Sequence, residues 1–308
     1  MAISTNCSPR SPSSIRPHNW PSLPVTEVER PLAPPPIATA LAWARARIGV
    51  VDARVLLRHV LGCPSAHLAA HPERPLDEEQ WCLYCALVEA RVNGEPVAYL
   101  TGEREFFGRS FLVSPAVLIP RPETELLVEL ALAHGGAHPR PRILDLGTGS
   151  GAIAITLALE LDGAEITAVD AAREALWVAM GNAARLGASV SFMQGSWFEG
   201  LAGERYQLIV SNPPYVAAGD PHLSQGDVRF EPRSALAAGA EGLDDLQHIV
   251  AAAPAHLDDD GWLLLEHGYD QAAAVRGLLT DAGFSAINSW ADLAGIERVT
   301  GGRWPGRP

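Results

Sequence analysis

From residue 141 onward, short apolar runs alternate with longer segments that have helical periodicity. Apolar runs of this kind are typical of strands buried on both faces, and the helices between them are typical crossovers between parallel strands. Because the last two runs lie close together in the sequence, they permit an antiparallel edge. The pattern predicts the α/β class, with a doubly wound, mostly parallel, seven-stranded sheet. The expected strands are residues 142–147, 165–170, 190–195, 206–212, 261–268, 285–290 and 297–304.

The N-terminal third has a different character. Residues 1–36 hold nine prolines and six serines, too little apolar surface to offset the entropy of ordering, so we expect a disordered tail. Residues 37–100 show helical spacing and predict a small helical domain, with Asp52 as an N-cap. Residues 101–135 are expected to form a hairpin and a linker helix, and residues 136–308 the α/β domain.

Composition limits the class of protein. No run of 18 apolar residues occurs, so no membrane partner is expected, and the formal net charge of −13 argues against a protein that coats nucleic-acid phosphates. Cys82 and Cys85 form a CxxC within a helical segment that offers no second ligand pair. We therefore expect no metal site and no disulfide framework, and a reducing cytoplasm is the expected compartment. We also expect a monomer that does not bind nucleic acid directly.

A glycine-rich loop links the first expected strand to the helix that follows it. The sequence LDLGTGSG places Gly147, Gly149 and Gly151 there, with Thr148 and Ser150 between them. Glycine allows a tight turn and a close approach of the backbone to a ligand, and the N-terminus of the next helix favours an anionic group. Taken alone, the loop is a weak signal, because a plain strand-to-helix turn would also explain it.

Two further residues favour binding of a nucleoside. The next expected strand ends at Asp170, 23 residues after Gly147, where a carboxylate can accept hydrogen bonds from both ribose hydroxyls. Trp197, after the third expected strand, offers a flat surface for an adenine, although core packing would also explain it. A nucleotide, a dinucleotide or S-adenosylmethionine would each satisfy this set. The absence of a GxxxxGKS/T motif excludes a P-loop.

The segment NPPY, from Asn212 to Tyr215, follows the fourth expected strand directly. Proline is disfavoured in a central strand, so Pro213 and Pro214 end it and leave a rigid turn rich in acceptors. Ligands of open α/β sheets bind beyond the carboxyl ends of the strands, so this turn faces the glycine loop if its strand is adjacent to the first. The Asn212 side-chain oxygen and the Pro213 carbonyl could then accept both hydrogens of a planar NH2 group, with Tyr215 packed on its face. This set predicts methyl transfer to an amide or aromatic amine nitrogen.

Together, DLGTGSG, the VD that ends at Asp170, and NPPY resemble class I S-adenosylmethionine-dependent methyltransferases that modify planar amino groups. The stretches VLIPRPETE, IVSNPPYV, GDVRFEPRSAL and GWLLLEHG extend the likeness. Residues 37–305 are similar to the peptide chain release factor glutamine-N5 methyltransferase (PrmC/HemK) family. The resemblance implies a methyltransferase sheet. It also implies that S-adenosyl-L-methionine methylates the glutamine of the GGQ motif in class I peptide chain release factors.

The resemblance further implies which residues bind what. The helical domain would dock the release factor, and residues 120–125 would roof the donor site. The methyl donor is expected at Gly147, Thr148, Gly149, Ser150, Gly151, Asp170, Trp197 and Asn212, and the glutamine amide at Asn212, Pro213, Pro214 and Tyr215.

Two positions depart from the family pattern. Ser196 stands where an aspartate is common, which replaces a carboxylate contact to the adenine amine by a hydroxyl that can still accept one hydrogen bond. Ala172 stands where a serine is common, and the tail of residues 1–36 is not part of the usual pattern. None of these differences alters the NPPY segment.

Three alternatives remain open at this point. A DNA amino-methyltransferase would need a target-recognition region and a basic face, and the sequence shows neither. A glutamine methyltransferase of a ribosomal protein would differ in the PRPETE stretch. A binding module that has the donor fold but no activity would be favoured by a degenerate NPPY, whereas Asn212, Tyr215 and Asp170 are all present.

Overall fold

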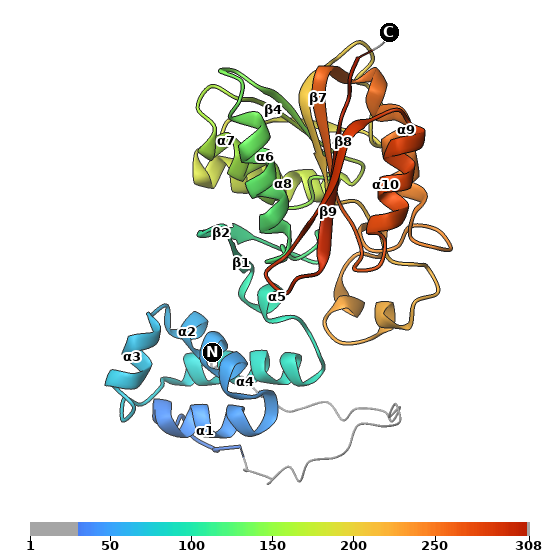
Figure 1. The fold of residues 1–308 in the computed structure, drawn as a ribbon. Coiled ribbons are helices and arrows are strands. Elements are labelled where there is room, and N and C mark those ends of the chain that lie inside the picture. The colour runs from blue at the N-terminus through green and yellow to red at the C-terminus, as the bar shows by residue number, and fades with distance from the viewer. Residues whose placement is uncertain (1–29, 307–308) are drawn as a thin grey trace. The chain divides into compact units, whose positions relative to one another are not determined.

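The computed structural model describes residues 30–306, which form two compact units whose boundary follows Thr101 (Figure 1). Most of the segment predicted to be a disordered tail, residues 1–29, lies outside the described residues. Pro35, near its end, accepts a hydrogen bond from the Leu76 amide at 3.1 Å and is part of the N-terminal unit. Within the described residues, no helix combines the length and the apolar character that crossing a membrane requires.

The N-terminal unit is built from helices, as the apolar spacing predicts. Trp43 packs edge-on against Trp81, with ring centroids 5.1 Å apart, and Tyr84 joins the same aromatic core. The Tyr84 hydroxyl donates a hydrogen bond to the Ala53 carbonyl at 2.8 Å, which fixes two of the helices to each other. The helices are α1 (Ile37–Ile48), α2 (Val50–Leu61), α3 (Ser65–Ala70), α4 (Glu78–Val92) and α5 (Val97–Thr101).

The prediction of Asp52 as a helix N-cap is wrong. Helix α2 begins at Val50, and its N-cap is Gly49, whose φ of 83° favours glycine. Asp52 lies in the first turn instead, where its Oδ2 accepts a hydrogen bond from Arg91 Nε at 2.7 Å. The two residues are 39 positions apart, so local sequence could not reveal this ion pair.

The second unit contains the predicted seven-stranded sheet. Five neighbouring strands, in the spatial order β5, β4, β3, β6 and β7, are parallel to one another. Strand β9 lies between β7 and β8 and runs antiparallel to both. The α/β class, the mostly parallel sheet and the antiparallel edge are thereby confirmed. In spatial order the strands are β5 (Ser191–Gln194), β4 (Glu165–Asp170), β3 (Arg142–Leu146), β6 (Tyr206–Ser211), β7 (Leu257–Glu266), β9 (Glu297–Arg303) and β8 (Ser285–Ala291).

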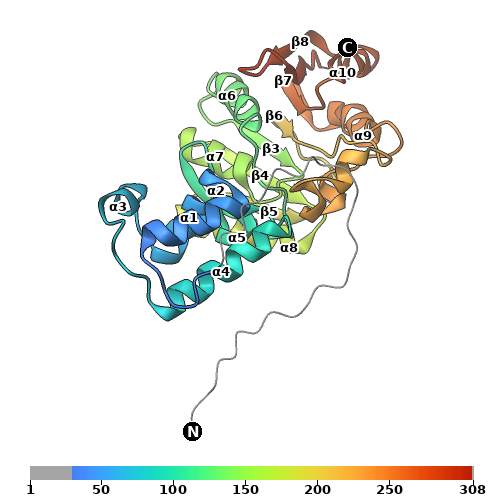
Figure 2. The ribbon, with the colours of Figure 1, turned by 90° about the horizontal axis from the view of Figure 1, so that it is seen from below.

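Helices cover both faces of this sheet, which makes it doubly wound (Figures 1 and 2). Side chains alternate along each strand, so β3 sends Ile143 into one core and Leu144 into the other. Both residues are fully buried, which is worth roughly 1.5–3 kcal/mol for each side chain. One face carries α6 (Thr124–Gly135), α7 (Ala152–Glu160) and α8 (Arg173–Leu186), and the other carries α9 (Asp244–Ala252) and α10 (Ala272–Asp281).

A two-stranded hairpin opens this unit, with β1 (Glu103–Phe106) antiparallel to β2 (Arg109–Leu112). Its two-residue turn has positive φ at both Phe107 (50°) and Gly108 (70°), the geometry that matches the twist of paired strands. Phe106 and Phe111 of the hairpin insert into the core beneath α6 and α7.

The carboxyl ends of β3 and β6 meet at one edge of the sheet. The two strands are parallel neighbours, with Leu146 in register with Ser211. The residues that follow them, Gly147 and Asn212, therefore leave the sheet side by side. This adjacency is the condition under which the glycine loop and the NPPY segment share one site, and the structure meets it.

Candidate active site

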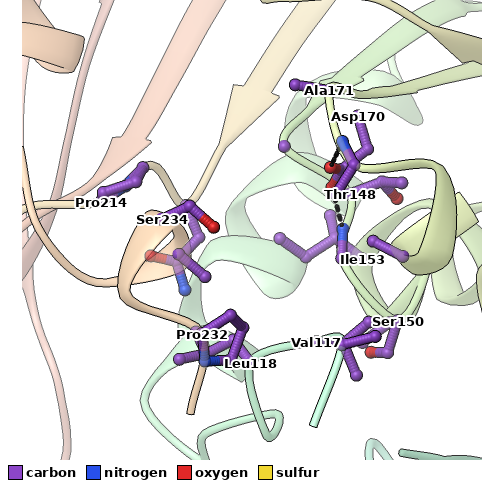
Figure 3. A pocket seen from close by; sticks show the side chains of 18 of the residues that line it. Val117, Leu118, Thr148, Ser150, Ile153, Asp170, Ala171, Pro214, Pro232 and Ser234 are labelled. Carbon is purple, nitrogen blue, oxygen red and sulfur yellow. Dashed lines mark hydrogen bonds between the residues drawn. The ribbon is translucent and has the colours of Figure 1, made fainter. Parts of the chain in front are cut away.

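A cavity of about 250 Å³ lies at this edge of the sheet. Figure 3 shows Asp170 and Thr148 on one side of it and Pro214 and Ser234 on the other. The cavity brings together these residues of the predicted site: Gly147, Thr148, Gly149, Ser150, Asp170, Trp197, Asn212 and Pro214. Gly151, Pro213 and Tyr215 lie next to it and are not among the residues that line it.

The glycine loop turns sharply between β3 and α7. Gly147, Gly149 and Gly151 have φ values of 73°, 55° and 81°, a region that L side chains rarely adopt. At Gly151 space is also limiting, because a Cβ there would lie 2.7 Å from Ile155 Cδ1 and 3.1 Å from Ala179 Cβ. The loop therefore needs glycine for its conformation at three positions and for helix packing at one.

Asp170 connects the end of β4 to this loop. Its Oδ2 accepts a hydrogen bond from Gly149 N at 2.8 Å, and its Oδ1 accepts one from Ala172 N at 2.9 Å. Burial raises the pKa of the Asp170 carboxyl, and these two backbone hydrogen bonds oppose the rise. A carboxylate has about four acceptor positions, so each oxygen keeps capacity for a further donor on the cavity side.

Asp145 is a buried residue of the site that the sequence analysis did not single out. It is fully buried in β3, and its Oδ2 accepts a hydrogen bond from the Thr148 hydroxyl at 2.7 Å. Burial raises the pKa of Asp145 to about 7, while the Thr148 hydroxyl opposes the rise. The hydrogen bond between Thr148 and Asp145 thus fixes the first turn of the glycine loop to β3. The sequence signal for a role of Asp145 was an acidic residue within an otherwise apolar strand.

Trp197 forms a wall of the cavity in an unusual backbone conformation. Its φ is 52°, a region that costs a residue other than glycine about 1–3 kcal/mol and that occurs most often at functional sites. Burial raises the pKa of the Asp245 carboxyl, and a hydrogen bond from Trp197 opposes the rise. Asp245 also lines the cavity and belongs to α9, a helix that the sequence analysis did not predict. Two aspartates in its first turn were the signal for it.

The Asn212 side chain is held by one specific contact. Its Nδ2 donates a hydrogen bond to Thr124 Oγ1 at 3.2 Å, at the start of α6. The amide is planar, so Oδ1 points away from Thr124, and it has no hydrogen-bond partner within residues 30–306. The Pro213 carbonyl likewise accepts no hydrogen bond from these residues. Two acceptors are thus available at the end of β6.

Tyr215 faces the core rather than the cavity. Its ring packs against the core on the α9 and α10 face, and its hydroxyl donates a hydrogen bond to Glu266 Oε1 at 3.5 Å. Burial raises the pKa of the Tyr215 hydroxyl, and the nearby Glu266 charge adds to the rise. Tyr215 is therefore neutral and able to donate at any physiological pH.

Glu231 links two loops that lie over the cavity, and its contacts with Ile119 and Arg121 are called the clasp below. Its side chain is fully buried, its Oε2 accepts a hydrogen bond from Ile119 N at 3.0 Å, and its Oε1 pairs with Arg121. Pro120 and Arg121 line the cavity from one loop, and Pro232 lines it from the other. A charge-assisted hydrogen bond is stronger than a neutral one, so Glu231 stabilises these two loops, which form the roof of the cavity.

Asn182 ties the glycine loop to the hairpin. It is fully buried in α8, its Oδ1 accepts from Leu112 N at 2.7 Å, and its Nδ2 donates to the carbonyls of Leu112 (3.0 Å) and Ser150 (2.9 Å). Its amide is therefore well satisfied, which fixes the loop against β2. Its partners lie 32 and 70 residues away, so local sequence patterns could not indicate this role.

Comparison with known proteins identifies the family. The PrmC N-terminal domain family matches residues 39–102, and the methyltransferase small domain family matches residues 122–227. A release factor glutamine methyltransferase of Xylella fastidiosa is 52% identical over 89% of this chain and 99% of its own. The chain belongs to the release factor glutamine methyltransferase family. A family member from Bordetella pertussis is 52% identical over 82% of this chain and 94% of its own.

The solved structures agree on the fold. A methyltransferase from Pyrococcus furiosus superposes with a TM-score of 0.51 at 18% identity, over 71% of this chain and 98% of that one. Family and fold make this chain an enzyme with S-adenosyl-L-methionine as its methyl donor. The cavity fits this donor chemically, because Asp170 has free acceptor positions for ribose hydroxyls and Trp197 offers a flat wall for an adenine.

Proposed function

We propose that this enzyme methylates the side-chain amide nitrogen, N5, of the GGQ glutamine in class I peptide chain release factors. The observation that carries the proposal is the pair of free acceptors, Asn212 Oδ1 and the Pro213 carbonyl, at the edge of a cavity suited to the methyl donor. A primary amide has two N–H hydrogens to donate, which matches two acceptors. The relatives named release factor glutamine methyltransferases support the substrate.

The chemistry requires an activated amide. A bound S-adenosyl-L-methionine supplies an electrophilic methyl group on a sulfonium. The amide nitrogen is a poor nucleophile because its lone pair is delocalised, and accepting both its hydrogens favours a more tetrahedral, more nucleophilic geometry. Asn212 and Pro213 would hold the nitrogen in line with the methyl, and positioning of this kind is worth roughly 7–11 kcal/mol at best. The nitrogen gains a methyl group and loses one proton to solvent, while the sulfonium becomes a neutral thioether.

Different residues of the chain would bind the methyl donor and the substrate. The glycine loop, Asp170 and Trp197 would bind the donor, and the clasp between Glu231 and Arg121 would close the roof over it. Pro214 would shape the entrance for the glutamine. Tyr215, which packs behind the cavity, would support the turn that presents Asn212 and Pro213.

The helical unit is proposed to dock the release factor. The family that matches residues 39–102 covers most of this unit, which supports a role shared with the relatives. We propose that the enzyme acts as a monomer in the cytoplasm and does not bind nucleic acid directly. The formal net charge of −13 is in keeping with the last point, because nucleic-acid phosphates attract basic surfaces.

Mass spectrometry tests the proposal. The enzyme is incubated with S-adenosyl-L-methionine and a purified class I release factor, and the peptide that carries GGQ is sequenced. We expect one added methyl on the glutamine side chain and none when the glutamine is replaced by glutamate. Methylation of a ribosomal protein or of DNA under the same conditions, with the release factor unmodified, would replace the proposal by one of the alternatives.

A further inference from the structure

Glu266 is a buried carboxyl beside the NPPY segment that has no part in the scheme above. It is the last residue of β7, and its neighbour Leu265 pairs with Ser211 of β6, which places Glu266 level with Asn212 across the two strands. The residue is 1% exposed, and its Oε2 has no hydrogen-bond partner within residues 30–306. A buried carboxyl with an unsatisfied oxygen is costly, so packing alone is a poor reason for it.

The contacts of Glu266 lead to the residues that would hold the substrate. Its Oε1 accepts the Tyr215 hydroxyl at 3.5 Å. Burial raises the pKa of the Glu266 carboxyl, and an interaction with the Thr124 hydroxyl opposes the rise. The same Thr124 oxygen accepts the Asn212 Nδ2 hydrogen bond at 3.2 Å. Glu266 itself does not line the cavity, so it acts through these neighbours rather than on the substrate.

The direction of the hydrogen bonds matters because an asparagine amide can present either its oxygen or its nitrogen. An ionised carboxylate only accepts, so it would draw the single Thr124 hydroxyl proton toward itself and leave the Thr124 oxygen to accept from Asn212 Nδ2. Asn212 Oδ1 then points away, free to accept from a substrate N–H. A protonated Glu266 could donate to Thr124 instead, which would free the hydroxyl proton to hold Asn212 Oδ1 and turn the nitrogen outward.

We propose that Glu266 is a positioning residue, which as a carboxylate orients the Asn212 amide through Thr124 and anchors Tyr215. The proposal rests on the proposed function, since it explains how that site presents an acceptor to the glutamine. It assigns to β7 a part in substrate recognition that the NPPY segment alone does not provide.

The groups around Glu266 set the pH at which this arrangement exists. Burial raises the pKa of its carboxyl to about 7; Thr124 lowers it, Glu123 raises it, and Arg298 and Tyr215 lower it. Thr124 and Glu123 face it from the start of α6, Arg298 from β9, and Tyr215 from the segment after β6. The carboxylate forms as pH rises through about 7, so the productive orientation of Asn212 should be lost as pH falls through that value.

Kinetics of the full chain with the donor and a class I release factor test the proposal. Glu266→Gln should lower kcat by about 10–100-fold, with the KM for release factor and the Kd for donor changed by less than about threefold. The wild-type pH profile of kcat should rise with an inflection near 7, and this inflection should vanish in Glu266→Gln and persist in Glu266→Asp. Glu129→Gln, an exposed substitution on α6, is the matched control and should leave all values unchanged.

A second readout needs neither substrate nor a Glu266 variant. With asparagine labelled by 15N, the Asn212 side-chain NH2 signals, assigned by their absence in Asn212→Ala, should titrate with a midpoint near 7 in the wild-type protein. A flat Asn212 titration, or wild-type kcat and an unchanged pH profile in Glu266→Gln, would overturn the proposal. If the wild-type enzyme leaves the glutamine unmodified, the proposed function fails, and the Asn212 titration still decides the role of Glu266.

Discussion

Replacing Gly151 by alanine tests how the glycine loop is packed against its helices. The position has a φ of 81°, and the left-handed region costs an L residue about 1–2 kcal/mol. The new Cβ would lie 2.7 Å from Ile155 Cδ1 and 3.1 Å from Ala179 Cβ, and overpacking of this kind typically costs about 1–3 kcal/mol. We expect Gly151→Ala to lower the free energy of unfolding by about 2–5 kcal/mol, the sum of these two ranges.

Gly187 provides the matched control, because it has a φ of 73° and a Cβ there would meet nothing within 4 Å. Gly187→Ala should therefore show only the conformational cost, about 1–2 kcal/mol. Ile155→Val removes the atom that the Gly151 Cβ would meet first. The double variant Gly151→Ala/Ile155→Val should consequently be less destabilised than the sum of its single variants, by about 1 kcal/mol.

Urea unfolding followed by circular dichroism measures these differences, and titration calorimetry measures donor binding. We expect donor affinity to fall in Gly151→Ala, because the same loop lines the donor cavity. If Gly151→Ala costs no more than Gly187→Ala, and the double variant is strictly additive, the close approach of α7 and α8 is not what requires glycine.

Three further substitutions probe other parts of the site. Asn212→Ala should lower kcat by about 10²–10³-fold while donor affinity changes only a few-fold, since it removes a substrate acceptor, and equal losses in both would contradict that role. Glu231→Gln keeps an acceptor for the Ile119 amide but removes the negative charge opposite Arg121. The donor Kd, measured by calorimetry, should therefore rise about tenfold, which corresponds to about 1.4 kcal/mol of binding free energy. An unchanged Kd would exclude a role of the contact between Glu231 and Arg121 in donor binding. Burial raises the pKa of Asp145 from 3.8 to about 7, so the folded state binds the extra proton and stability should fall as pH rises from about 4 to 7. Asp145→Asn should flatten this part of the curve of Tm against pH, and an unchanged slope would mean that Asp145 does not titrate there.

Local patterns were sufficient for much of the fold. The apolar strand runs and the glycine loop each depend on neighbouring residues, and the sheet has the strands expected from them. The adjacency of β3 and β6 could not be predicted in this way, because strand order depends on contacts between distant segments. The misplaced cap at Asp52 has the same origin, since its partner Arg91 lies in another helix.

The supporting residues of the site were beyond local patterns. Asp145 is the penultimate residue of β3 and Glu266 is the last residue of β7, and the sequence alone does not say which acidic residues in strands support a site. Thr124 was visible within PRPETE, but its hydrogen bond to Asn212 spans 88 residues. Residues that would touch the ligands were therefore easier to name than residues that hold them in place.

The measurement that tests the central claim most directly is the mass of the GGQ peptide after reaction, compared between the wild-type enzyme and Asn212→Ala. The claim is that Asn212 Oδ1 and the Pro213 carbonyl present a glutamine amide to the methyl donor. It predicts a single added methyl on the glutamine with the wild-type enzyme and almost none with the variant at saturating donor. Full methylation by Asn212→Ala, or no methylation by a wild-type enzyme that binds donor, would contradict it.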